Sequence, residues 1–236
     1  MKFQFKQFSV EQDRCAMKIG TDGVLLGAWS PLDHNPSTVL DIGAGTGIIA
    51  LMIAQRCAAD QIDALEIDEE AYEQAVDNFE NSPWSDRLFC FHAELDEFME
   101  EPEDEYDLIV SNPPFYTEDY TSKDEQRNLA RFTDSLPFED LIEAASFLLS
   151  EQGVFTVIIP HKEEEQFILW ANECELYPFK ITRVKGNLTS KIKRSLIAFC
   201  RTKTNNLIID ELIIEIGRHE YTPEYINLTK DFYLKM

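Results

Sequence analysis

A short stretch around two consecutive prolines contains the residues best suited to carry chemistry. Asn112 precedes Pro113 and Pro114, and Phe115 and Tyr116 follow them. Because each proline fixes φ and lacks an N–H group, the backbone here forms a stiff, extended corner. The Asn112 side-chain oxygen and the Pro113 carbonyl can accept both hydrogens of a planar amino group, and Phe115 can stack on its ring. The stretch indicates chemistry on an exocyclic amine, although taken alone it fits a strand-ending surface loop equally well.

A glycine-rich loop provides a second candidate site. Gly43, Gly45 and Gly47 follow an apolar strand that contains Asp41. A dinucleotide site uses the spacing G-x-G-x-x-G, which would require glycine where Ile48 stands, and no Lys-Ser/Thr pair of a P-loop follows. The loop therefore suits a bulky ligand without a pyrophosphate. Its backbone N–H groups are expected to receive a carboxylate, the tail of an amino acid.

A carboxylate at the end of the next strand completes this prediction. Glu66 lies 25 positions after Asp41, where it can accept both hydroxyls of a ribose. A nucleoside that has an amino-acid tail and no phosphate is S-adenosylmethionine. The sequence therefore predicts S-adenosylmethionine as the cofactor.

The elements that must position these residues alternate between strands and helices. Such alternation is typical of an α/β fold with one doubly wound sheet. In such a sheet the strand order reverses after the first strand, and ligands bind at that switch point, so the glycine loop and the proline corner should face one crevice. Seven strands are expected in the core, at residues 38–42, 62–67, 88–91, 106–110, 153–159, 179–185 and 195–201.

The chain is expected to form a single domain, residues 1–236. Residues 1–36 form an N-terminal extension that we expect to pack near the cofactor site, with Thr21 or Asp22 capping a helix from Val24. Residues 37–203 form the core sheet, and an acidic turn is expected at residues 93–98. Residues 204–236 add a strand at residues 207–216 and a final helix that begins at Thr222-Pro223.

Composition and charge limit the function. No apolar run approaches the ~18 residues of a membrane span, and no signal sequence begins the chain, so we expect a soluble cytoplasmic protein. The five cysteines and four histidines show no metal-ligand spacing, and no metal or disulfide framework is expected. The net charge is −23, yet residues 180–203 contain eight of the 21 basic residues and no acid. This segment is either a solvated basic hairpin or a surface for a polyanion.

Three stretches of the sequence carry a resemblance to a known family: residues 8–29, with the sequence KIGTDGVLLG; residues 40–56; and residues 111–116. Together they resemble the class I S-adenosylmethionine-dependent methyltransferases that carry an Asn-Pro-Pro-aromatic motif. More narrowly, the chain resembles the bacterial tRNA1(Val) adenine-37 N6-methyltransferases. The resemblance implies a Rossmann-like fold with a seven-stranded, mostly parallel sheet and helices on both faces, and methylation of adenine 37 in the tRNA anticodon loop.

The resemblance also implies residue roles. The cofactor would be held by Asp41, Gly43, Gly45, Gly47, Glu66 and Glu94, with Asp96 as the alternative to Glu94 because the family more often has Asp at that motif. Asn112, Pro113 and Phe115 would be catalytic. The basic segment and the aromatic residues of the corner, rather than the resemblance, make Tyr116, Lys191, Lys193 and Arg194 the candidate RNA contacts. The resemblance makes tRNA the expected partner. The oligomeric state stays open, with a monomer favoured.

Two alternative functions remain at this point. The same corner would also suit guanine N2 of ribosomal RNA or a protein glutamine, because an amide nitrogen presents the same two hydrogens. The short segment before the first core strand leaves no room for a separate protein-recognition domain, which favours nucleic acid. A non-catalytic RNA- or nucleotide-binding protein on the same scaffold is disfavoured by the intact Asn112 corner.

Overall fold

The computed structural model describes residues 2–100, 105–114 and 136–236. Its strands are β1 (Lys2–Gln4), β2 (Ser9–Glu11), β3 (Thr38–Ile42), β4 (Gln61–Glu66), β5 (Leu88–His92), β6 (Tyr106–Ser111), β7 (Leu149–Pro160), β8 (Tyr177–Asn187), β9 (Ile192–Cys200), β10 (Ile208–Gly217) and β11 (Glu220–Tyr221). Its helices are α1 (Thr21–Trp29), α2 (Ile48–Arg56), α3 (Glu69–Glu80), α4 (Leu95–Glu100), α6 (Phe138–Leu148), α7 (Glu164–Glu173) and α8 (Pro223–Thr229), and a 3₁₀ turn, η1 (His161–Glu163), precedes α7.

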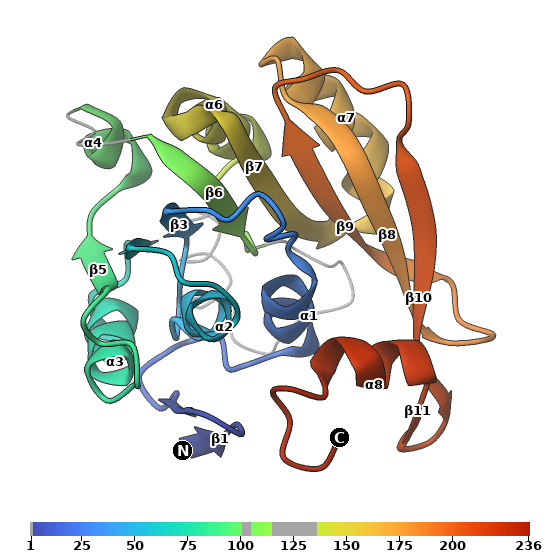
Figure 1. Cartoon of the computed structure of the whole chain (residues 1–236), viewed down its shortest axis with the longest axis horizontal. Coiled ribbons are helices and arrows are strands. Elements are labelled where there is room, and N and C mark those ends of the chain that lie inside the picture. Colours follow the sequence, from blue (N-terminus) through green and yellow to red (C-terminus); the bar gives the residue numbers. More distant parts are fainter. Residues whose placement is uncertain (1, 101–104, 115–135) are drawn as a thin grey trace, which may run out of the picture.

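One twisted sheet runs through the molecule in the order β11-β10-β8-β9-β7-β6-β3-β4-β5 (Figure 1). It contains the seven expected core strands, and β10 and β11 extend it to nine within the described ranges. Strands β5, β4, β3, β6 and β7 are parallel to one another, whereas β9 is antiparallel to both β7 and β8. The order reverses after β3, as expected of a doubly wound sheet, so β3 and β6 lie next to each other at the switch point.

Helices cover both faces of this sheet and enclose two separate hydrophobic cores. Successive residues of a strand point to opposite faces. Val39 therefore packs in the core beneath α1 and α2, while Leu40 packs in the core beneath α6 and α7. Both residues are fully buried. A strand that is apolar on both faces cannot lie at a solvated surface, which is why β3 occupies the middle of the sheet.

The N-terminal extension packs on the helix that follows the glycine loop. Gly23 and Gly27 lie on the side of α1 that contacts α2, where a Cβ atom at Gly27 would lie 2.8 Å from the sulfur of Met52. These glycines allow the two helices to approach closely. The hairpin of β1 and β2 meets the end of the chain, because Phe5 forms a β-bridge with Tyr233 and the N–H of Lys6 donates to the Phe232 carbonyl at 2.8 Å.

Two local expectations about helices are wrong. The expected acidic turn at residues 93–98 is largely helical, since α4 begins at Leu95 with Asp96 and Glu97 in its first turn, where acids favour the helix dipole. Helix α1 begins at Thr21, and its N-cap is Gly20 without a side-chain cap. Asp22 instead accepts a hydrogen bond from Arg194, a partner 172 positions away.

The expected starts of the helices α3 and α8 are confirmed. Asp68 caps α3 by accepting a hydrogen bond from the N–H of Ala71 at 2.8 Å. Thr222 caps α8 by accepting one from the N–H of Tyr225 at 3.2 Å, with Pro223 at the first helical position. Among the helices of the described residues, none combines the length and apolar composition needed to cross a membrane.

Candidate active site

The glycine loop and the proline corner leave the sheet side by side. Ile42 at the end of β3 is in register with Ser111 at the end of β6, and the Ser111 hydroxyl donates to the Ile42 carbonyl at 2.9 Å. Gly43 directly follows β3, and Asn112 directly follows β6. Neighbouring strands lie about 4.8 Å apart, so these two segments begin at the same point of one sheet edge. We call this edge, where the parallel strands end, the carboxyl edge.

The glycine loop needs glycine for two different reasons. Gly43, Gly45 and Gly47 have φ values of 74°, 56° and 75°, a left-handed conformation that disfavours other residues. A Cβ at Gly47 would lie 2.4 Å from the ring of Phe79, so this glycine also permits close packing on α3. A Cβ at Gly43 or Gly45 would meet nothing within 4 Å. The space in front of these two residues can receive a bulky ligand, as a nucleoside cofactor requires.

Most amides of this loop donate to acceptors within the chain. The N–H groups of Gly43 and Ala44 both donate to the Leu65 carbonyl, at 2.9 and 3.0 Å. The N–H of Gly45 donates to Glu66 at 2.7 Å, and that of Gly47 donates to the Ala44 carbonyl at 2.9 Å. The expectation that the loop amides receive the carboxylate of an amino-acid tail is therefore not supported for these four groups.

Glu66 is fixed at the end of β4 by two backbone donors. One carboxylate oxygen accepts from the N–H of Gly45 and the other from the N–H of Asp68, at 2.7 and 2.9 Å. The residue is 9% exposed. Each carboxylate oxygen can accept a second hydrogen bond, so this carboxylate retains the capacity to hold a ribose hydroxyl. Its position fits the predicted role in binding a nucleoside.

The two acids proposed for the adenine of the cofactor also lie at the carboxyl edge. Glu94 follows β5 and accepts the N–H of Phe98 on its backbone carbonyl at 3.0 Å, so it sits at the start of α4. Asp96 lies in the first turn of that helix. Both side chains are exposed. The structure is therefore compatible with either residue in this role.

Asp41, although predicted with the cofactor loop, is fully buried within β3. One of its carboxylate oxygens accepts the N–H of Ala50 in the first turn of α2 at 3.1 Å, while the other has no hydrogen-bond partner among the described residues. Burial raises the pKa of this carboxyl to about 7, against the effect of the Ala50 hydrogen bond. The N-cap of α2 is Gly47, which has no side chain, so Asp41 supplies a capping acceptor from the neighbouring strand.

The proline corner is partly accessible to solvent. Asn112 is half-buried, Pro113 is buried and Pro114 is exposed. An amide that is half-buried beside the glycine loop can meet a ligand that enters at the carboxyl edge. Phe115 and Tyr116, predicted to stack on the substrate, lie outside the described residues.

Most cations of the basic segment are occupied by structural contacts. Three form ion pairs with carboxylates of other elements: Arg183 with Glu164, Lys185 with Glu211 and Arg194 with Asp22. Two lie over aromatic rings: Lys180 over Trp29 and Lys203 over Tyr177. Arg201 donates to the carbonyls of Ser146 and Leu149. These contacts leave fewer cations available to bind a polyanion than the sequence suggested. Arg194, a predicted RNA contact, is paired with Asp22 of α1.

Lys191 and Lys193 are exposed at the β8–β9 hairpin. Because β9 is antiparallel to both β7 and β8, strand β8 runs parallel to β7 and ends at the carboxyl edge. In the sheet order, β9 is two strands away from β6, which corresponds to about 10 Å. These two lysines therefore lie at the same edge as Asn112.

The structure also reveals two buried polar residues that we did not predict. Gln74 and Asn78 of α3 are each 2% exposed and contact the N-terminal extension. Their signal in the sequence is their position, because they stand four residues apart on the helix face that also carries the apolar Ala71, Ala75 and Phe79. Within the described part of the chain, no group of three or more His, Cys, Asp or Glu side chains is placed to hold a metal ion.

Comparison with known proteins defines the class. The Methyltransferase small domain family matches residues 24–173. A solved structure from Agrobacterium tumefaciens, described as a predicted O-methyltransferase, has a TM-score of 0.69 and 21% sequence identity and covers 89% of this chain and 96% of its own. At that identity the likeness establishes the fold alone. The fold and the match define a class I S-adenosylmethionine-dependent methyltransferase, and the open glycine loop and Glu66 fit that cofactor.

Curated relatives define the family within this class. A tRNA1(Val) (adenine(37)-N6)-methyltransferase of Flavobacterium johnsoniae is 72% identical over 234 residues, which cover 99% of this chain and 100% of that protein. A protein of the same name from Bacteroides fragilis strain YCH46 is 46% identical over 235 residues, 99% of this chain and 98% of that protein. The chain belongs to the family of these tRNA1(Val) (adenine(37)-N6)-methyltransferases.

Proposed function

We propose that this protein methylates N6 of adenine 37 in the anticodon loop of tRNA1(Val), with S-adenosylmethionine as the methyl donor. The observation that carries the proposal is the register of β3 and β6. It brings the glycine loop and Asn112 to adjacent positions at one sheet edge. A cofactor in front of the loop and an amine at Asn112 would then share one site.

The chain's own residues orient the amine. The lone pair of an adenine N6 is delocalised into the ring, so the group is a weak nucleophile. Hydrogen bonds from both N6 hydrogens to the Asn112 side-chain oxygen and the Pro113 carbonyl favour a pyramidal nitrogen, with its lone pair directed away from both acceptors. Asn112 is thus an orienting and electrostatic group, and the proton is lost to solvent only once the nitrogen has become positively charged.

The cofactor contributes an activated methyl group, so no metal or strong base is required for the transfer. The chain's main task is to position the two reactants and exclude water. Gly43 and Gly45 leave the necessary space, and Glu66 offers a fixed carboxylate for the ribose. Phe115, which follows the prolines, is the residue that we propose to stack on the adenine.

Substrate access fits an unpaired nucleotide. An enzyme that reacts with a base must take it out of its stack, which is least costly in a single-stranded loop such as the anticodon loop. We propose that the exposed Lys191 and Lys193 contact the phosphates beside that loop, with Tyr116 as a further contact. We place this activity in the cytoplasm, because its substrate is there.

The experiment is methyl transfer from labelled S-adenosylmethionine to total tRNA, total ribosomal RNA and protein extract in parallel. We expect label in tRNA alone, and in the purified tRNA1(Val) we expect it as N6-methyladenosine at position 37. Incorporation into ribosomal RNA or protein instead would assign the same chemistry to a different amine. Binding of the cofactor without any methylated product would contradict the proposal.

A further inference from the structure

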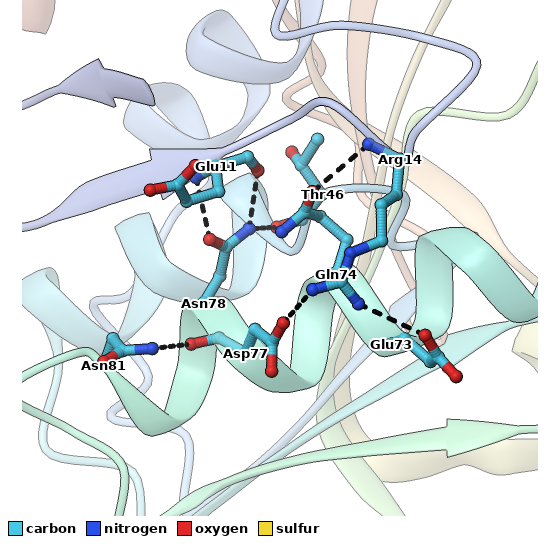
Figure 2. A network of polar contacts seen from close by, with 8 residues as sticks. All are labelled: Glu11, Arg14, Thr46, Glu73, Gln74, Asp77, Asn78 and Asn81. Carbon is cyan, nitrogen blue, oxygen red and sulfur yellow. Dashed lines mark hydrogen bonds and ion pairs between the residues drawn. The ribbon is translucent and has the colours of Figure 1, made fainter. Parts of the chain in front are cut away.

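The segment between β2 and α1, residues 12–20, is held beside the glycine loop by the buried polar residues of α3. Figure 2 shows the contacts, in which Asn78 and Gln74 point from α3 towards the extension. Neither residue belongs to the proposed set of cofactor- or substrate-binding groups. Buried amide side chains are retained only where hydrogen bonds satisfy them, so their partners indicate what they are for.

Asn78 joins two backbone segments, the end of β2 and the glycine loop. Its side-chain nitrogen donates to the carbonyls of Glu11 and Thr46, both at 2.9 Å. Its side-chain oxygen accepts the N–H of Glu11 at 2.8 Å. Thr46 lies inside the glycine loop, and Glu11 is the last residue of β2. One amide therefore fixes the end of the hairpin against the loop.

Other residues of α3 also hold the glycine loop and the segment before α1. Phe79, adjacent to Asn78, packs against Gly47 of the loop. One turn earlier, Gln74 accepts the backbone N–H of Arg14 at 3.3 Å. The guanidinium of Arg14 forms ion pairs with Asp77 and, at 3.2 Å, with Glu73 (Figure 2). The segment is thus anchored along one face of α3.

Two side chains of the anchored segment, those of Gln12 and Cys15, are buried. Cys15 is buried, and its pKa is raised to about 12, first by burial and then by the negative charges of Glu66 and Asp68. The side chain of Gln12 accepts the N–H of Ile19 at 2.9 Å, which closes the segment into a compact loop before α1.

We infer that Asn78 is a positioning residue for the cofactor, and that it holds residues 12–20 as a wall of the pocket in front of the glycine loop. The inference rests on the proposed function, in that S-adenosylmethionine occupies this pocket. Loss of the Asn78 amide would remove its three hydrogen bonds to the Thr46 carbonyl and to both backbone groups of Glu11. The loop and the wall would then separate, and the pocket would lose its preorganised shape.

The test compares Asn78→Ala with Asn81→Ala. Asn81 is the C-cap residue of the same helix, and its amide, as far as the described residues show, donates only to the Asp77 carbonyl of that helix, so it is a matched control (Figure 2). We expect the dissociation constant of S-adenosylhomocysteine, measured by calorimetry, to rise about tenfold in Asn78→Ala and to stay unchanged in Asn81→Ala. Hydrogen exchange should become faster at residues 11–20 and 43–47 in Asn78→Ala alone.

A second variant covers the case in which Asn78→Ala fails to fold. Arg14 is partly exposed, so Arg14→Ala loosens the same segment from α3 without removing a buried group. We expect a smaller rise in the dissociation constant, of about threefold, because the Asn78 bonds remain. In steady state, both variants should raise KM for S-adenosylmethionine and leave kcat and the KM for RNA unchanged.

Wild-type affinity for S-adenosylhomocysteine in folded Asn78→Ala, or in Arg14→Ala where the former does not fold, would overturn the inference. Equal weakening in Asn81→Ala would also overturn it, because the effect would then be one of helix stability. Failure of the proposed function is separate, because it would appear as absent tRNA methylation by the wild-type chain while the binding measurements still apply.

Discussion

Asp41 and Asn112 are polar residues at the ends of neighbouring strands, and their burial gives them different roles. Asp41 is completely buried and supports the first turn of α2, whereas Asn112 is half-buried at the carboxyl edge. From the sequence, both residues were predicted to belong to the active site. Only the structure shows that Asp41 acts on the loop through the helix behind it.

The buried Asp41 predicts a specific dependence of stability on pH. Its folded pKa of about 7 lies above the unfolded value of 3.8, so the stability that it contributes is present below the unfolded pKa and is lost as pH rises towards 7. A pKa difference of this size corresponds to about 4 kcal/mol of unfolding free energy. In Asp41→Asn no ionisation occurs. The difference in unfolding free energy, wild type minus variant, should therefore fall between pH 4 and pH 8, as measured by urea denaturation.

This comparison cancels the titration of the other carboxylates, because they are shared by both proteins. A difference that stays constant across that pH range would show that Asp41 is not protonated in the folded protein at acidic pH. It would then contradict the raised pKa of this buried carboxyl.

At the scale of elements, sequence patterns predicted the sheet well and the helix starts less well. Apolar runs such as residues 38–42 and 106–110 indicated central strands, because only a buried parallel strand is apolar on both faces. The start of α1 was missed because Asp22 is engaged by Arg194, a contact that no local pattern contains. The six-residue α4 was missed because local preferences barely favour so short a helix over a turn.

In the candidate site, features set by local residue chemistry were predicted from the sequence, whereas contacts between distant segments were not. The Asn-Pro-Pro corner and the glycine spacing were visible because they depend on backbone chemistry that particular residue types provide. The partners of the basic segment were not visible, since pairs such as Arg183 and Glu164 form only after the sheet has assembled. Gln74 and Asn78 were missed because an amide on a helix face reveals its function only when its partner segment is known.

Alanine substitutions in the glycine loop distinguish the two reasons for glycine there: the left-handed φ and the close packing on α3. Gly43 and Gly47 have nearly the same φ, so alanine at either position meets the same backbone cost of about 1–2 kcal/mol. Gly47→Ala adds a clash with Phe79, which costs about 1–3 kcal/mol more by overpacking. Urea denaturation should therefore show Gly47→Ala to be the less stable variant. Equal loss of stability in the two variants would mean that the loop does not depend on its contact with α3.

At the scale of the molecule, a net charge of −23 must be reconciled with a polyanionic substrate. The contacts of the basic segment show that most of its cations neutralise acids of the protein itself or lie over aromatic rings. We therefore propose that the exposed Lys191 and Lys193, at the carboxyl edge, attract the RNA. The negative net charge of the chain would then favour an approach of the RNA from that edge.

Lys191 and Lys193 provide the test of this arrangement. The double change Lys191→Ala and Lys193→Ala should raise KM for tRNA roughly tenfold and reduce the slope of its salt dependence by about two. The affinity for S-adenosylhomocysteine should not change. Lys203→Ala is the matched control, because Lys203 belongs to the same basic segment but lies beside Tyr177, at the start of β8 and hence at the opposite edge. An equal effect of Lys203→Ala on KM would contradict an edge-specific RNA surface.

We propose that the Asn112 corner and the glycine loop form one site in which an adenine amine is oriented for methyl transfer. The most direct measurement is kcat for tRNA methylation by Asn112→Ala, together with its affinity for S-adenosylhomocysteine. Loss of one preorganised polar group predicts a decrease in kcat of about 100-fold or more. Cofactor affinity should stay within about twofold of wild type, and Asn112→Asp, which keeps an accepting oxygen, should retain an intermediate kcat. Turnover near the wild-type value in Asn112→Ala would show that Asn112 does not orient the amine.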